Sequence, residues 1–151
     1  MLITKEIEID MAHRVCFHKS KCRNLHGHRY KIEVGVDDKI NEEYGTSDYG
    51  MVIDFSDLKD IMKKELDERF DHGAVFYRND PYRSKLEEMI MLNDQSKDKL
   101  HFVDFMPTAE NLCKYWFELV DKPLKEKGIN LEYVKVWETP TSTAIYRRGD
   151  K

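Results

Sequence analysis

The sequence predicts an α+β fold in which an antiparallel sheet is covered by helices on one face. Three observations support this fold class. Four segments alternate apolar and polar residues as half-buried strands do, two longer segments repeat apolar residues at helical spacing, and their order is strand, strand, helix, helix, strand, strand. With 151 residues and no linker or internal repeat, the chain is expected to form a single domain over residues 1–151.

The first two predicted strands lie in the N-terminal part of the chain. Residues 3–9 place isoleucines on one face and carboxylates on the other. Residues 30–36 alternate more regularly, because Tyr30, Ile32 and Val34 share one parity and charged residues lie between them. Such alternation is typical of antiparallel strands that face the core on one side only.

The first predicted helix follows residues 51–55, which are expected to be a short strand end. Ser56 is a plausible N-cap for this helix. The buried stripe of the helix would consist of apolar residues at helical spacing, namely Leu58, Ile61, Met62, Leu66 and Phe70.

The second long helix is predicted to open at the Pro-Thr pair 107–108, and its apolar stripe extends over residues 112–120. Pro123 and Gly128 are expected to mark its end. In the polar stretch between the two long helices, a short helix is predicted around residues 86–90.

The last two predicted strands are residues 131–137 and 143–147. A sheet of four short strands leaves two edges unpaired, and pairing with a neighbouring subunit is a natural way to hide them. We therefore expect a homo-oligomer.

Composition excludes several classes of protein. Charged residues make up 36% of the chain and hydrophobic residues 40%, which is too apolar for a disordered chain. No apolar run approaches the ~20 residues of a membrane span, and no signal peptide is expected at the N-terminus. The three cysteines are an odd number, so a disulfide framework is not expected and a cytoplasmic location fits better. The net charge of −4 argues against a nucleic-acid partner.

Candidate metal-ligating and catalytic residues are most concentrated around a His-Gly-His motif. His26 and His28 open a predicted strand, so their side chains point to the same face, about 6.5–7 Å apart. If the first two strands form a hairpin, His13 arrives beside this pair. Three neutral histidines with one open position are the arrangement of a catalytic zinc. The alternatives are turn or surface histidines, or a closed zinc module that also uses Cys16 and Cys22, although the ligand spacing of such a module is poor.

Three further positions carry candidate chemistry. Cys22 precedes His26 closely and could be a fourth ligand, a nucleophile, a general base or an inert thiol. Asp71 directly precedes His72, and such a carboxylate can fix the imidazole tautomer, although an exposed Asp-His pair at a helix end is common. Glu138 continues the apolar face of a strand. A carboxylate at such a position either anchors a ligand or is simply exposed at the surface.

Residues 14–29 carry no acidic residue and five basic ones, which are Arg14, Lys19, Lys21, Arg23 and Arg29. In a chain of net charge −4 this is a local positive patch, which suits a polyanionic substrate such as a polyphosphate. The alternative is a solvated loop.

Glu110 lies in the first turn of the second long helix, where the helix dipole favours a carboxylate in any case.

Six short motifs occur in the order in which one known family carries them. They are Ala12-His13-Arg14, Cys22-Arg23-Asn24-Leu25-His26-Gly27-His28, Gly50-Met51-Val52-Ile53-Asp54-Phe55, Asp71-His72, Pro107-Thr108-Ala109-Glu110-Asn111-Leu112 and Glu138-Thr139. By these motifs the chain resembles the family of 6-pyruvoyl-tetrahydropterin synthases and 6-carboxy-tetrahydropterin synthases. The matches extend over residues 12–146.

The resemblance implies the tunnelling fold, a four-stranded antiparallel sheet with two helices on one face. Several subunits, as a hexamer or a tetramer, would assemble such sheets into a barrel. The resemblance also implies one zinc ion per subunit on His13, His26 and His28. It implies a proton-transfer set of Cys22, Asp71 and His72. The implied pterin contacts are Glu138, which also belongs to the proton relay, together with Thr108 and Glu110.

The implied substrate is a small molecule, 7,8-dihydroneopterin triphosphate. No membrane partner is expected for the protein. The three residues between Cys22 and His26 resemble the spacing of the bacterial carboxy-forming members, whereas the animal-type pyruvoyl-forming members carry a longer gap. We therefore expect a zinc-dependent lyase that yields 6-carboxy-5,6,7,8-tetrahydropterin, acetaldehyde and triphosphate in the route to 7-deazaguanine nucleosides such as queuosine. The alternatives are a 6-pyruvoyl-tetrahydropterin synthase that releases triphosphate only, and a non-catalytic pterin-binding protein.

Overall fold

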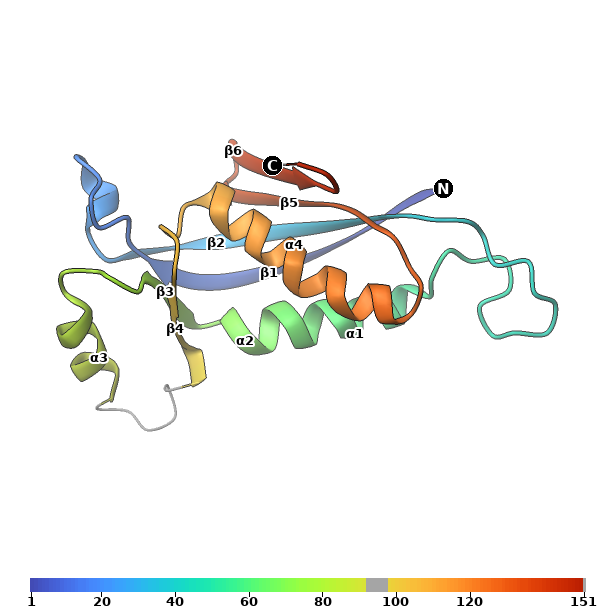
Figure 1. Cartoon of the computed structure of the whole chain (residues 1–151), viewed down its shortest axis with the longest axis horizontal. Helices are drawn as coiled ribbons and strands as arrows, with labels where there is room; N and C mark the ends of the chain where they lie inside the picture. Colours follow the sequence, from blue (N-terminus) through green and yellow to red (C-terminus); the bar gives the residue numbers. More distant parts are fainter. Residues whose placement is uncertain (92–97, 151) are drawn as a thin grey trace.

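A computed structural model describes residues 1–91 and 98–150 of the chain. It is an α+β structure in which the two long helical segments, residues 55–70 and 109–126, pack on one face of a curled six-stranded sheet (Figure 1). In chain order the elements are β1 (Leu2–His13), η1 (Lys21–Arg23), β2 (His26–Asp37), α1 (Phe55–Met62), η2 (Lys63–Asp67), α2 (Glu68–Phe70), β3 (Gly73–Tyr77), α3 (Arg83–Met91), β4 (Leu100–Val103), α4 (Ala109–Glu126), β5 (Leu131–Thr139) and β6 (Ser142–Arg147).

The four predicted strands are confirmed as β1, β2, β5 and β6, and each pairs antiparallel with the next. The prediction of a four-stranded, wholly antiparallel sheet is wrong, because the strand order is β4-β3-β1-β2-β5-β6 and β3 and β4 are paired in parallel. These two strands are short, and their residues do not alternate between apolar and charged. Periodicity therefore could not distinguish them from loops.

The first helix differs from its prediction at its start. Residues 51–55 form no strand, and Asp54 rather than Ser56 caps the helix by accepting a hydrogen bond from the Ser56 N–H at 2.7 Å. From Phe55 the helix continues through the π-helical turn η2 to the end of α2 at Phe70.

The second long helix begins as predicted, with Thr108 as the N-cap of α4. It does not end at Pro123, which lies inside the helix, and it continues to Glu126. Leu124, which is fully buried, packs this last turn into the core and offsets the lost backbone donor of the proline. The short helix expected around residues 86–90 is confirmed within α3. None of the helices in the described ranges combines the length and apolar character needed to cross a bilayer.

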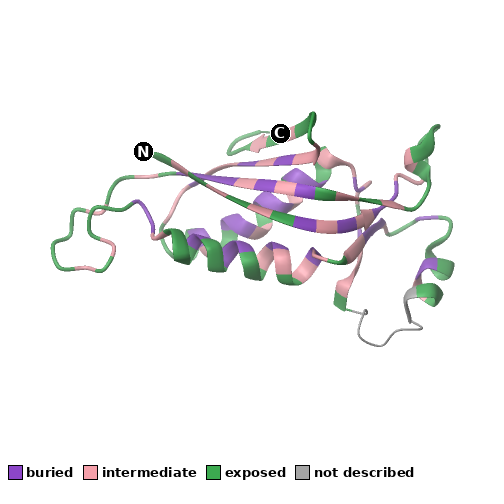
Figure 2. Ribbon diagram, turned by 180° about the vertical axis from the view of Figure 1, so that it is seen from behind, coloured by how far each residue is buried: buried purple, intermediate pink, exposed green. Residues whose placement is uncertain are grey.

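The core lies between the helices and one face of the sheet. Buried residues alternate with more exposed ones along the central strands (Figure 2). On β2 the buried set begins with Tyr30, whose ring meets that of Trp116 on α4 at 5.5 Å between centroids. The same face continues beyond Tyr30 to the start of β2, which is where the polar residues of the candidate site lie.

Gly73 is the point at which β3 leaves the helix and enters the sheet. A methyl group at this position would lie 2.7 Å from the Lys99 carbonyl oxygen and 2.9 Å from the Phe70 carbonyl oxygen. Both obstacles are backbone atoms, which cannot rotate away as a side chain can. The position therefore requires glycine for packing.

We expect Gly73→Ala to lower the free energy of unfolding by about 1–3 kcal/mol, because the backbone must move away from the Lys99 and Phe70 carbonyl groups to admit the methyl group. Urea denaturation followed by circular dichroism measures the change. Ser142→Ala, at an exposed position on β6, serves as the control and should leave stability nearly unchanged. Wild-type stability in Gly73→Ala would contradict the packing requirement.

Candidate metal centre and active site

Three histidines meet where β1 ends and β2 begins. The antiparallel register sets His13 directly opposite His26, and His28 opposite Met11. The predicted hairpin is thus confirmed, and it brings the third histidine beside the other two. One ligand nitrogen from each ring lies within 4.8 Å of those from the other two, so the triad could hold a single metal ion. We call His13, His26 and His28 the histidine triad.

Backbone contacts orient two rings of the triad. The His13 Nδ1 is 2.7 Å from the Pro107 carbonyl oxygen, and the His26 Nδ1 is 2.8 Å from the Asn24 carbonyl oxygen. A ring nitrogen in such a contact carries the proton, which leaves the Nε2 lone pair free for a metal. Burial lowers the pKa of His13 and of His28, which favours the neutral form that binds metals. Three neutral imidazoles with room for a further ligand fit a zinc ion.

The Glu138 carboxylate faces the triad. Its Oε1 is 3.7 Å from the Nε2 of His13 and 4.0 Å from the Nε2 of His28. Tyr30 completes this group, because its hydroxyl lies 3.4 Å from the same carboxylate oxygen. Burial raises the pKa of Tyr30 well above its usual range. Sequence reasoning assigned Tyr30 only to the apolar face of a strand, although its position two residues after His28 on the same face was an available signal.

Cys22 lies apart from the group of possible metal ligands. It is half-buried in η1, and the Val15 N–H donates to its carbonyl oxygen at 2.9 Å. Among the described residues, the one cluster of possible metal donors consists of the histidine triad and includes no cysteine. The alternative of a closed Cys/His zinc module is therefore not supported. Cys113 on α4 is buried, with its Sγ 3.1 Å from the Val134 carbonyl oxygen, so this thiol is part of the packed core.

Asp71 and His72 are held against β1 at the end of α2. The Asp71 Oδ1 accepts from the Asp10 N–H at 2.8 Å, the His72 N–H donates to the Asp10 carbonyl oxygen at 2.7 Å, and the Asp71 Oδ2 is 2.6 Å from the His72 Nδ1. Burial raises the pKa of Asp71, but the hydrogen bonds from Asp10 and His72 outweigh it and the net shift is downward. His72 has a φ of 55°, in the left-handed region that residues other than glycine rarely adopt.

The exposed His72 side chain lies on the outer face of the sheet, away from the helices. It lines a pocket of about 480 Å³ with the outward-facing Asp10, Ala12 and Arg29, and His28 of the triad lines the same pocket. Within one chain, the pocket beside His72 is therefore bordered by one member of the histidine triad, whereas His13 and His26 do not line it. The carboxylate of Asp10 is engaged by Arg29 through two hydrogen bonds, of 3.0 and 2.9 Å.

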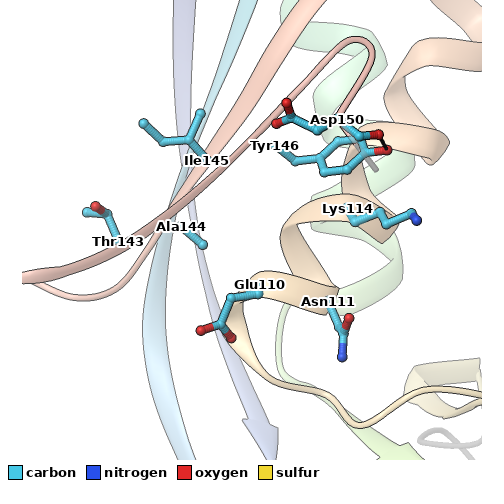
Figure 3. A pocket seen from close by; sticks show the side chains of 8 residues that line it. All are labelled: Glu110, Asn111, Lys114, Thr143, Ala144, Ile145, Tyr146 and Asp150. Carbon is cyan, nitrogen blue, oxygen red and sulfur yellow. Dashed lines mark hydrogen bonds between the residues drawn. The ribbon is translucent and has the colours of Figure 1, made fainter.

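The two glutamates assigned to a pterin pocket lie in different pockets. Glu138 lines a pocket of about 600 Å³ with His28 and Trp137. Glu110 lines another, of about 490 Å³, between the start of α4 and the edge strand β6, where Figure 3 shows it beside Thr143 and Ala144. Thr108 acts as a helix cap, and its Oγ1 accepts from the Asn111 N–H at 3.5 Å.

One member of the basic segment is not available to a polyanion. Arg14 is buried, with its Nε 3.1 Å from the buried Asp80 Oδ2, and its guanidinium lies over the Tyr82 ring at 4.7 Å. The prediction that it belongs to a free positive patch is therefore wrong, because its partner comes from a distant part of the chain. Lys19, Lys21 and Arg23 remain exposed.

Comparisons with known proteins give a consistent result. The model of a family described as 6-pyruvoyl tetrahydropterin synthase matches residues 2–149. A protein of Haemophilus influenzae named 6-carboxy-5,6,7,8-tetrahydropterin synthase is 32% identical over 145 residues, which cover 96% of this chain and 97% of that protein. A protein of the same name from Aquifex aeolicus is 37% identical over 133 residues, 85% of this chain and 76% of that protein.

Two solved structures have the same fold. An uncharacterized protein from Wolinella succinogenes gives a TM-score of 0.78 at 23% identity, with 97% of both chains covered. The 6-pyruvoyl tetrahydropterin synthase of Caenorhabditis elegans gives a TM-score of 0.65 at 24% identity, with 97% of this chain and 94% of that chain covered.

We expect a variant with both His26→Ala and His28→Ala to lose its metal, because a single imidazole cannot retain the ion. Cys22→Ala should keep its metal, since Cys22 lies outside the donor cluster. Elemental analysis of protein purified after zinc loading measures both. Full zinc occupancy in the double variant would contradict this site, and loss of zinc from Cys22→Ala would place the thiol among the ligands.

Proposed function

The chain belongs to the 6-pyruvoyl tetrahydropterin synthase family, and from this membership we propose that it is a zinc-dependent carbon–carbon lyase. Its reaction would convert 7,8-dihydroneopterin triphosphate to 6-carboxy-5,6,7,8-tetrahydropterin with release of acetaldehyde and triphosphate, in the route to 7-deazaguanine nucleosides such as queuosine. The observation that carries this proposal is a carboxylate, Glu138, facing three convergent histidines at the end of the sheet. The names of the relatives at 32% and 37% identity support the carboxy-forming reaction.

The histidine triad would hold one zinc ion per subunit. When bound, the ion would supply a positive charge that acidifies the hydroxyl groups and the carbon-bound protons of the substrate's side chain. The contacts of His13 with Pro107 and of His26 with Asn24 keep their rings in the orientation and tautomer that this role requires.

Glu138 would anchor the pterin ring. A carboxylate can accept two adjacent N–H groups as a bidentate pair, and such charge-assisted bonds fix both position and orientation. Because Glu138 also lies close to His13 and His28, a ring bound to it would present its side chain toward the triad.

Cys22, Asp71 and His72 would transfer protons. A thiolate at Cys22 could remove a carbon-bound proton, and His72, oriented by the Asp71 carboxylate at 2.6 Å, could return one elsewhere. Since Cys22, His13 and His26 do not line the pocket that His72 lines, we propose that this set is completed between subunits. Residues of β6 lie on an open edge of the sheet and offer a surface for such an assembly.

We expect a homo-oligomer, a hexamer or a tetramer, at micromolar concentration by light scattering. Mixing Cys22→Ala subunits with His72→Ala subunits should restore about a quarter of wild-type turnover, because random assembly pairs an intact Cys22 with an intact His72 from a neighbour at that frequency. Each variant alone serves as its control. A monomer with full activity would contradict the assembly, and mixed oligomers without restored turnover would contradict a set shared between subunits.

The product distinguishes the carboxy-forming reaction from its alternatives. We expect acetaldehyde, trapped during turnover of 7,8-dihydroneopterin triphosphate, in amounts equal to the triphosphate released. Triphosphate without acetaldehyde would assign the pyruvoyl-forming reaction instead. Tight binding of the pterin with neither product would indicate a non-catalytic binding protein.

A further inference from the structure

We propose that Tyr30 is a positioning residue of this site, whose hydroxyl fixes the Glu138 carboxylate in the orientation that receives the pterin ring. The inference rests on the proposed function, because it assumes that Glu138 contacts the pterin. It assigns a role to a residue that the sequence pattern explains equally well as part of the apolar core.

The Tyr30 ring is held rigidly. Its side chain is fully buried on β2, on the same face as His28. The ring packs edge-on against Trp116 at 5.5 Å and against the rings of His13 and His28 at 5.9 and 5.6 Å between centroids. Because the ring cannot turn aside in such surroundings, its hydroxyl stays at one point between the core and the site.

When a metal ion occupies the His13 Nε2, the Glu138 carboxylate is the acceptor that remains for the Tyr30 hydroxyl. The hydroxyl lies 3.3 and 3.4 Å from the two ring nitrogens of His13 and 3.4 Å from the Glu138 Oε1. The His13 Nδ1 is already engaged with the Pro107 carbonyl oxygen, so its Nε2 lone pair is the one left for a metal. A buried hydroxyl without an acceptor costs stability, so the Tyr30 O–H is directed to Glu138.

The Tyr30 hydroxyl would determine the orientation in which the Glu138 carboxylate meets the pterin ring. Its Oε1 already faces the Nε2 atoms of His13 and His28 at 3.7 and 4.0 Å, so without a fixed donor this oxygen could move closer to them. A rigid donor on the core side holds the carboxylate in one rotamer and reduces the ordering needed when a ligand binds. Removing the hydroxyl alone should therefore weaken pterin binding without disturbing the metal.

The experiment is a double-mutant cycle on the zinc-loaded protein, with Tyr30→Phe, Glu138→Gln and the combined variant. Isothermal titration with oxidised neopterin, which carries the ring and side chain without phosphates, measures affinity. Elemental analysis measures zinc, and circular dichroism measures folding. Tyr133→Phe is the matched control, because the Tyr133 hydroxyl also donates to a glutamate, Glu33, at 2.7 Å, but outside the site.

We expect Tyr30→Phe to weaken neopterin binding about threefold to tenfold with full zinc content, and Tyr133→Phe to bind as the wild type does. In the Glu138→Gln background, the same Tyr30 substitution should change affinity by less than about twofold, since the group it positions has been altered. A merely structural role would produce equal losses in both backgrounds.

Unchanged affinity in Tyr30→Phe, or an equal loss in both backgrounds, would overturn the positioning role while leaving the proposed function intact. Unchanged affinity in Glu138→Gln alone would instead refute the pterin contact of Glu138, and with it this inference. Loss of zinc from Tyr30→Phe would also overturn the proposal, because the hydroxyl would then support the triad rather than the carboxylate.

Discussion

The pairing of β1 with β2 is the constraint on which the rest of the structure depends. Its register sets His13 against His26, and the alternation of the strands carries all three histidines to the face that the helices cover. A slip by one residue would turn the side chains of the slipped strand to the opposite face, which would expose its core residues and separate the triad. The long apolar face of β2, from Tyr30 to Val36, therefore fixes the position of the site as well as that of the core.

The site is a polar extension of the hydrophobic core. Along the inner face of β2, buried aliphatic residues give way to Tyr30 and then to the two histidines, while Glu138 ends the corresponding face of β5. Polar groups at such depth are tolerated when each has a partner. Here the partners include two backbone carbonyl groups, those of Asn24 and Pro107, which come from segments just outside the regular elements.

Sequence periodicity predicted the parts of the fold that are long enough to show it. The four antiparallel strands and the two long helices follow from alternation and helical spacing. The same parity argument placed His26 and His28 on one face of their strand and Glu138 on the apolar face of another. The short parallel strands β3 and β4 carry too few residues to show a period. Local patterns cannot reveal contacts between distant segments. Two such contacts are the ion pair of the buried Arg14 with Asp80 and the hydrogen bond from the Asp10 N–H to the Asp71 carboxylate. The alternation gave no separate indication that Tyr30 belongs to the site, because Tyr30 fits the apolar pattern of its strand.

The contact between His13 and Pro107 joins a metal ligand to the segment that leads into α4. Ligand binding that depends on a folded contact stabilises that contact in proportion to the ligand's affinity, and the reverse also holds. Docking of the α4 N-terminus and loading of the metal are therefore thermodynamically linked reactions. An ion bound at the triad would therefore slow the exchange of amide hydrogens in the first turn of α4, although α4 contributes no ligand to the ion.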